Sequence, residues 1–269
     1  MTVSICEDPW LFVIIAFIDE VQVYSCEPPY QRTNDITVKG IDCPVDITSS
    51  KDGDLLILDS TGLLWTIKVT DDLQDVIVVS KRYVRDCYDQ IQSISLTSGG
   101  RIMMPDYQDL NVACKCSCMH REHEVLFQLN SRCKPKNAIQ MRDNQYIVLG
   151  FDDKKEMVNK ISVFEGDGRE IVSFGDNDFL PGEMKLNNPS HIALSENGDV
   201  FVADKNNGRI LVFNRELKLV RTVQTKFEDV MYKPHRLCYD NRRRELMVAT
   251  TNGDLLVLCI QQPALSEKW

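Results

Sequence analysis

The sequence predicts an all-β fold, a six-bladed β-propeller of four-stranded antiparallel blades. Three observations predict it. Short apolar runs alternate with turns that contain Asn, Asp and Gly, and a unit of about 45 residues recurs along the chain. The chain has 269 residues, and six blades of this period need about 270. A single domain therefore fills the whole length.

The clearest copy of the unit runs from Leu186 to Phe213, with the sequence LNNPSHIALSENGDVFVADKNNGRILVF. Its three apolar runs are separated by Asn197-Gly198 and by Asn206-Asn207-Gly208. Asn and Gly tolerate the positive φ that tight hairpin turns require. The unit is therefore expected to be a meander of short antiparallel strands.

The other copies keep the position of one buried apolar residue, which we call the anchor, three places after a proline in the clearest copy. The anchors are Ile5, Ile47, Ile94, Ala138, Ile192 and Leu237. They are 42 to 54 residues apart, the spacing expected of propeller blades. The predicted blades are residues 1–40, 41–85, 86–131, 132–175, 186–225 and 231–269.

An aspartate recurs twelve places after three of these anchors, as Asp59, Asp106 and Asp204. A carboxylate at the end of a strand can accept hydrogen bonds from the backbone of the following turn. We expect these aspartates to brace turns rather than to bind a ligand.

The segment from Leu186 to Phe213 resembles an NHL repeat. Val202-Ala203-Asp204 and the strand from Asn206 to Phe213 carry the resemblance, with Gly208 as one additional residue before Arg209. The closest resemblance is to the C-terminal propeller of tripartite-motif (TRIM) NHL ubiquitin ligases. It implies a domain of the ubiquitin pathway that chooses a substrate and has no ligase chemistry of its own.

The composition is that of a soluble globular protein, with 43% hydrophobic and 26% charged residues. The apolar run from Trp10 to Ile18 is shorter than the roughly 20 residues of a membrane span, and no basic residue precedes it. We therefore expect a buried strand there, and a cytoplasmic protein that makes no membrane contact. The ten cysteines are expected to be free thiols.

The segment from Cys114 to His120 has the residue types of a zinc site, since Cys116 and Cys118 lie between them. In a strand, however, side chains two residues apart begin about 6.5 to 7 Å apart, too far for three thiolates on one tetrahedral zinc. The alternation with Lys115 and Ser117 favours a half-buried strand. No metal and no other cofactor is predicted, although a loop conformation would favour a metal.

The residue before each anchor is polar. These residues are Ser4, Asp46, Ser93, Asn137, His191 and Arg236. The innermost strands of a propeller line its channel, so the six side chains are expected near one mouth, where they either contact water or form a binding site. One histidine and one aspartate make a poor metal site, and the blades separate His191 from Asp46 and Arg236. We therefore expect a non-catalytic protein, with a metal-dependent enzyme as the least favoured alternative.

The loop face, formed by the loops between blades and between second and third strands, is the second predicted binding surface. Its candidate residues are Arg82, Tyr83, Arg85, Lys154, Lys155, Phe179, Lys205 and Arg209. In related TRIM-NHL propellers this face binds single-stranded RNA or protein. Because the net charge is -9 and the pI about 5.0, the sequence favours a protein partner over RNA, which remains the alternative.

Two long connections of the loop face, Phe151 to Lys160 and Gly175 to Asn188, carry apolar residues that short loops do not need. They flank the fourth and fifth predicted blades, where we expect the protein partner. The last blade shows no clear fourth strand. Met1 to Ile5 is an alternative source of that strand, in which case Ser4 would leave the channel ring.

Overall fold

The computed structural model describes residues 2–5, 10–14, 20–25, 30–84, 91–106, 111–115, 124–129, 133–142, 144–152, 158–175, 185–227 and 230–260. Nearly all of its regular structure is β. In the described part of the chain, five sheets have four strands, one sheet has three, and two further strands form a hairpin. The predicted all-β fold of four-stranded antiparallel sheets is confirmed at this level.

The first three sheets follow one another along the chain, each in simple sequential order. The first contains β1 (Thr2–Ile5), β2 (Trp10–Ile14), β3 (Glu20–Ser25) and β4 (Arg32–Thr37). The second contains β5 (Pro44–Ser49), β6 (Leu55–Asp59), β7 (Leu63–Val69) and β8 (Val76–Tyr83). The third contains β9 (Ser95–Leu96), β10 (Ile102–Asp106), β11 (Asn111–Lys115) and β12 (Glu124–Gln128).

The remaining sheets repeat this order. The fourth contains β13 (Cys133–Gln140), β14 (Gln145–Asp152), β15 (Val158–Glu165) and β16 (Glu170–Phe174). The fifth contains β17 (His191–Leu194), β18 (Val200–Asp204), β19 (Arg209–Phe213) and β20 (Leu219–Gln224), with a 3-10 turn η2 (Lys205–Asn207) after β18. The hairpin β21 (Lys226–Phe227) and β22 (Val230–Met231) precedes the last sheet, which has β23 (Pro234–Asp240), β24 (Glu245–Thr250) and β25 (Leu255–Cys259).

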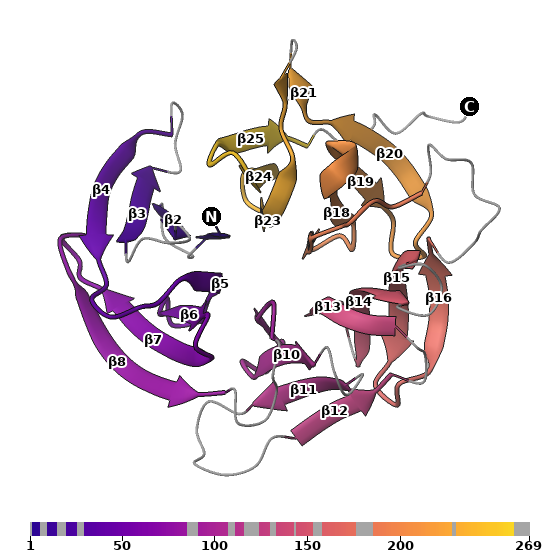
Figure 1. The fold of residues 1–269 in the computed structure, drawn as a ribbon, viewed down its shortest axis with the longest axis horizontal. Coiled ribbons are helices and arrows are strands. Elements are labelled where there is room, and N and C mark those ends of the chain that lie inside the picture. The colour runs from indigo at the N-terminus through magenta and orange to yellow at the C-terminus, as the bar shows by residue number, and fades with distance from the viewer. Residues whose placement is uncertain are drawn as a thin grey trace.

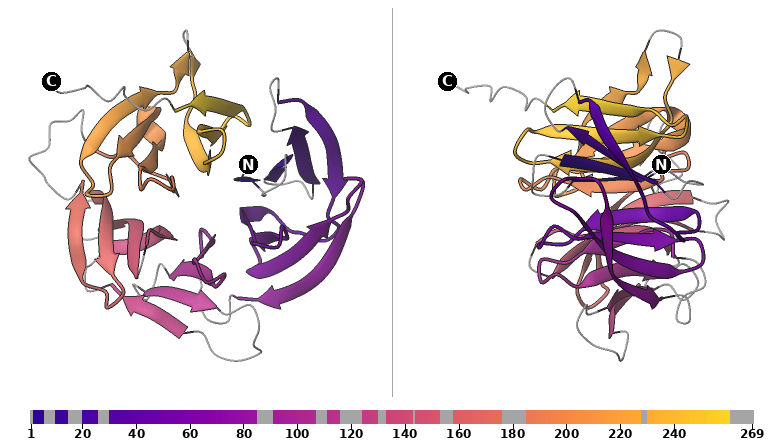
Figure 2. Two further views of the ribbon diagram at one scale, coloured as in Figure 1. Left: turned by 180° about the vertical axis from the view of Figure 1, so that it is seen from behind. Right: turned by 90° about the vertical axis from the view of Figure 1, so that its left-hand side faces the viewer.

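The sheets stand around a central axis, with the first strand of each sheet towards the axis and the last strand at the rim (Figure 1). Seen edge-on, they form a flat body that is wider than it is thick (Figure 2). One flat side of this body carries the hairpin turns between first and second strands and between third and fourth strands. We call this side the turn face. The other carries the loop face defined above.

The core that the described side chains form lies between neighbouring sheets. Ile147 and Val163 of the fourth sheet pack with Val202 and Phe213 of the fifth, and Phe201 stacks on Tyr239 of the last sheet with ring centroids 4.9 Å apart. The anchors that the structure describes with their side chains are buried, at 4% exposure or less. They are Ile47, Ile94, Ala138, Ile192 and Leu237.

The first and last sheets also contact each other. The Tyr30 hydroxyl donates a hydrogen bond of 2.6 Å to the Glu245 carboxylate, and Tyr24 packs against Met247 and Ala249. Strand β1 pairs with β2 in the first sheet, so the alternative in which Met1 to Ile5 completes the last sheet is wrong. The last sheet has three strands among the described residues.

Of the aspartates expected to brace the following turn through its backbone, one of the two with described side chains does so. Asp59 accepts hydrogen bonds from the Thr61 and Leu63 amides at 2.9 and 3.0 Å, as predicted. Asp204 instead accepts from the Asn187 amide of the preceding connection at 2.7 Å. The side chain of Asp106 lies outside the described residues.

The extra residue of the NHL-like segment, Gly208, has a local explanation. It ends the turn η2 in a left-handed conformation, with φ 59° and ψ 42°. A Cβ atom at this position would lie 2.6 Å from Cγ of Met231, closer than packed carbons approach. Glycine therefore lets the hairpin β21–β22 pack on this turn.

Candidate functional site

The polar residues before the anchors are buried rather than open to water. Asp46, Ser93, Asn137 and Arg236 are at most 7% exposed, and His191 is half-buried. A register shift follows a proline in β5, β13 and β23. Such a bulge re-aims the next side chain, and here that side chain lies in the interior of the ring. The side chain of Ser4 lies outside the described residues.

Asp46 and Arg236 form an ion pair between the second and last sheets. Arg236 Nε lies 3.3 Å from Asp46 Oδ1, with side-chain exposures of 9% and 3%. The blades were expected to separate His191 from Arg236, but the Leu237 amide, one residue after Arg236, donates a hydrogen bond of 3.3 Å to His191 Nδ1. Burial raises the pKa of Asp46, while Arg236 and the Ile94 amide oppose that shift.

Arg236 uses its remaining donors on the protein itself. Its Nη2 atom donates to the carbonyls of Val45 at 3.1 Å and Gln92 at 3.4 Å, and Nη1 donates to the His235 carbonyl at 3.3 Å. The guanidinium thus connects the last, second and third sheets. Its role is to hold the centre of the ring together.

The other polar residues connect neighbouring sheets in a repeated way. Asp46 Oδ2 accepts a hydrogen bond of 2.8 Å from the Ile94 amide of the next sheet, and His191 Nδ1 accepts one of 3.3 Å from the Leu237 amide. Ser93 donates to the Lys136 carbonyl at 3.0 Å. Asn137 departs from this pattern, because its Oδ1 has no hydrogen-bond partner among the described residues.

The two described histidines are neutral at neutral pH. Burial, then Arg236 and His235, hold the pKa of His191 well below its usual range. Burial, then Arg236 and Lys205, lower the pKa of His235 to about 3. A general base at neutral pH needs a pKa near 7, so these imidazoles do not match that role.

The lowered pKa values of the two histidines predict that the protein loses stability in mild acid. A histidine whose pKa is 6.5 when unfolded and about 3 when folded binds a proton more readily in the unfolded chain, so stability falls as the pH drops below 6.5. The slope is at most about 1.4 kcal/mol per pH unit for each histidine. Urea unfolding of the wild type and of His235→Gln between pH 7 and 5 measures it.

Between pH 6.5 and 5, we expect His235→Gln to reduce the slope of the unfolding free energy against pH by up to about 1.4 kcal/mol per pH unit, the contribution of one proton. The unfolding free energy at pH 7 should change less. The window above pH 5 limits interference from carboxylates, which titrate near pH 4. An unchanged slope in the variant would contradict a neutral, buried His235.

Four of the eight loop-face candidates have described side chains. Lys205 is half-buried in η2. Arg209 is buried and pairs with Asp204 at 2.7 Å, so its position differs from the expected exposed loop. Arg82 and Tyr83 end the outermost strand β8 instead of lying in a loop, with Tyr83 60% exposed. Arg85, Lys154, Lys155 and Phe179 lie outside the described residues.

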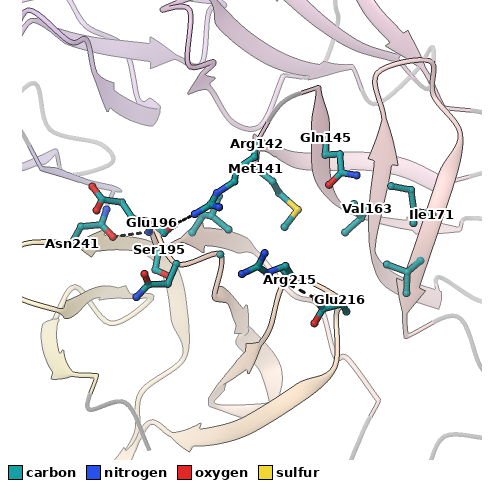
Figure 3. Close-up of a pocket in the computed structure, with 14 residues that line it drawn as sticks. Met141, Arg142, Gln145, Val163, Ile171, Ser195, Glu196, Arg215, Glu216 and Asn241 are labelled. Atoms are coloured by element: carbon teal, nitrogen blue, oxygen red, sulfur yellow. Dashed lines mark hydrogen bonds and ion pairs between the residues drawn. The ribbon is translucent and has the colours of Figure 1, made fainter. Parts of the chain in front are cut away.

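A groove on the turn face lies between the fourth and fifth sheets (Figure 3) and encloses about 890 Å³. Apolar side chains from both sheets line it: Met141, Val163, Ile171, Val172 and Leu194. This volume is within the range of about 300 to 1,000 Å³ found for ligand pockets.

Charged and amide groups from the hairpin turns surround the apolar part of this groove. Arg142 donates to the Glu196 carbonyl at 2.7 Å, and Asn241 accepts from the Glu196 amide at 2.8 Å. Arg215 extends into the groove from the side opposite Arg142 (Figure 3). Its Nε atom lies 3.9 Å from Oε1 of the next residue, Glu216. These contacts fix the turns at one edge of the groove and leave a rim with both signs of charge.

The sequence did not predict this groove. Its polar residues lie in turns such as Glu196 to Gly198, whose composition is fully explained by hairpin geometry. Ile171 is the groove residue that attracts attention, because an isoleucine on an outer strand is usually covered, whereas this one is 43% exposed. Its exposure, however, appears only in the folded structure.

The described residues contain no group of three His, Cys, Asp or Glu side chains placed to hold a metal ion. Cys114 lies in β11 opposite Met103, in agreement with the predicted strand there. Cys116, Cys118 and His120 lie outside the described residues. Among the helices of the described structure, none is both long enough and apolar enough to span a membrane.

Comparison with known proteins identifies one repeat and the fold. The NHL repeat model matches residues 186–213, and no curated protein sequence matches the chain. An inactive virginiamycin B lyase from Staphylococcus aureus, solved with quinupristin, is similar over 97% of this chain and 80% of that chain, with 13% identity and a TM-score of 0.64.

Two other solved structures are similar at the same level. The β-propeller domain of Cps50 (Swd1) from Myceliophteria thermophila has 11% identity and a TM-score of 0.60 over 97% of this chain and 83% of that chain. A protein from Lactobacillus plantarum has 14% identity and a TM-score of 0.61 over 97% and 85%. At these identities the likeness shows a β-propeller fold, and it does not transfer the lyase activity.

Proposed function

We propose that this chain is a closed, six-bladed NHL-type propeller that binds another protein and has no catalytic activity of its own. Six sheets around one axis (Figure 1) and the contact between Tyr30 and Glu245 support the closed ring. The low pKa values of His191 and His235 support a non-catalytic role. The TRIM-NHL resemblance supports a cytoplasmic role in choosing a ubiquitination substrate, with ligase chemistry supplied elsewhere.

The groove between the fourth and fifth sheets carries this proposal. Its apolar floor fits an aliphatic or aromatic side chain, and burying one is worth about 1.5 to 3 kcal/mol. Its rim holds Arg142 and Arg215 together with Glu196 and Glu216. Because RNA affinity depends on unopposed cations, this balanced rim favours a peptide segment with an apolar residue between charged residues.

A displayed peptide library, selected on the wild-type protein, provides the probe. The affinity of each enriched peptide is then measured by fluorescence polarisation for the wild type, Ile171→Lys and Val220→Lys. Ile171 lines the groove, whereas Val220 is equally exposed on the outer strand of the fifth sheet and lies outside it, at 43% and 49%. The second variant is therefore a matched control.

We expect Ile171→Lys to weaken peptide binding about tenfold or more, which is about 1.4 kcal/mol, and Val220→Lys to leave it within about twofold. Equal affinities of the two variants would contradict a peptide site in the groove. Titration with mixed RNA pools at low and physiological salt tests the alternative. Retained RNA affinity at physiological salt would favour RNA as the partner.

A further inference from the structure

A cluster of lysines lies on the loop face, opposite to the groove, around the start of the innermost strands. Lys136 is in the bulge of β13, Lys205 is in the turn after β18, and Lys233 directly precedes β23. First strands begin, and second strands end, at this face, since His191 pairs with Ala203 in β17 and β18. Three successive sheets therefore bring one lysine each to the same side of the ring.

The charges of this cluster act on one another. Burial lowers the pKa of Lys205, and the positive charges of Arg236 and Lys233 lower it further. Burial lowers the pKa of Lys136, and Lys205 lowers it further. Lys205 belongs to the fifth sheet, between the sheets that carry Lys136 and Lys233, and is therefore the middle lysine of the cluster.

No described carboxylate forms an ion pair with these three lysines. Asp46 is paired with Arg236, whose Nε lies 3.3 Å from Asp46 Oδ1. Lys136 donates to the Asn188 side chain at 3.2 Å, which is a neutral partner. The cluster therefore carries an excess of positive charge that the described residues do not balance.

Neighbouring groups complement this charge. Arg236 donates to Asp46 and to three backbone carbonyls, so it contributes a fixed positive charge rather than a direct contact. His191 accepts a hydrogen bond at Nδ1, which places the proton of the neutral imidazole on Nε2, a donor. The ammonium groups of the lysines are donors, and the charge of Arg236 acts on Lys205; donors and positive charge are the groups that bind an oxyanion.

We propose that Lys136, Lys205 and Lys233 form a binding site for a phosphate group, centred on Lys205. Lysine is a common phosphate ligand because its ammonium group is a compact point charge. A doubly charged phosphate balances the excess charge better than a singly charged carboxylate. The site is independent of the peptide groove, which lies on the other face.

Isothermal titration calorimetry at constant ionic strength tests the site with inorganic phosphate, O-phosphoserine and acetate. The variants are Lys205→Met and Lys233→Met, with Lys218→Met as the control. Lys218 is an exposed lysine of the β19–β20 turn, on the turn face. Methionine keeps an unbranched side chain of nearly the same length and removes the ammonium group.

We expect saturable binding of inorganic phosphate to the wild type, and weaker binding of acetate. Lys205→Met should weaken phosphate binding about tenfold or more, Lys233→Met less, and Lys218→Met by no more than about twofold. Tighter binding of O-phosphoserine than of phosphate would identify a phosphate ester as the ligand, and equal binding would identify the free ion.

Three results would overturn the proposal: no saturable phosphate binding, equal loss in Lys205→Met and Lys218→Met, or acetate binding as tight as phosphate binding. The unfolding temperature of each variant shows whether it is folded. Removing one of several mutually repelling charges should not lower it. If Lys205→Met is unstable, the comparison of Lys233→Met with Lys218→Met decides in the same way.

Discussion

Replacing Asp46 with leucine is expected to lower the free energy of unfolding by about 3 to 5 kcal/mol, because it leaves a buried arginine without its counter-charge. Arg236 has a side-chain exposure of 9% and lies 3.3 Å from Asp46. Asp46 also accepts the Ile94 amide, so the substitution removes a hydrogen bond between the second and third sheets. Urea unfolding at pH 7 measures the loss.

The double variant Asp46→Leu with Arg236→Met separates charge burial from packing. Replacing a buried ion pair by apolar side chains is often neutral or stabilising, so we expect the double variant to be more stable than Asp46→Leu alone. Recovery should be partial, since the carbonyls of Val45 and Gln92 also lose a donor. Asp71→Leu, at an exposed turn position, is the control and should change stability by about 0.5 kcal/mol or less.

Additive effects of the two single substitutions would contradict this account. A buried, contacting pair should show a coupling energy of at least about 1 kcal/mol in the double-mutant cycle. A coupling near zero would mean that Arg236 finds water or another partner when Asp46 is absent.

Local chemistry predicted much of the fold. Turns such as Asn197-Gly198 were predicted from residues that tolerate positive φ, and Gly198 has φ 87°. The anchors were predicted from their spacing, and Ile192 and Leu237 are buried. The turns depend on residues close together in the sequence, and the anchors on a period that repeats along the chain, so a single sequence was sufficient for both.

The candidate sites were harder to predict because they depend on distances between sheets. The sequence identified the polar residues before the anchors, but the contact between Arg236 and Asp46 joins residues that are 190 positions apart. Arginine is usually a surface residue, but Arg209 is buried and pairs with Asp204. The peptide groove combines Val163 and Leu194 from two sheets, and no local pattern connects them.

The strand-end aspartates also differ in a way that the sequence could not show. Asp59 accepts two backbone amides, the Thr61 hydroxyl and the Trp65 indole. Asp204 accepts one amide, the Asn207 side chain and Arg209 Nε. The same residue twelve places after an anchor thus braces a turn in one sheet and neutralises a buried cation in another.

This difference predicts the second large effect. Asp204→Asn is expected to destabilise the protein by about 3 kcal/mol or more, because an uncharged amide removes the buried counter-charge beside Arg209. Asp204 is fully buried, and its Oδ2 lies 2.7 Å from Arg209 Nε. Asp59→Asn removes no counter-charge and should cost about 1 to 3 kcal/mol, the penalty of hydrogen bonds that the amide cannot replace.

Urea unfolding of the two variants at pH 7 tests this order, with Asp71→Asn as an exposed control. If Asp59→Asn costs as much as Asp204→Asn, hydrogen bonding rather than charge determines both effects. A further substitution distinguishes the two causes: Arg209→Met should restore part of the stability lost in Asp204→Asn, because it removes the buried charge that Asp204 balances. Restored stability would mean that the buried ion pair of Asp204 and Arg209 stabilises the NHL-like repeat together with the apolar runs that define it.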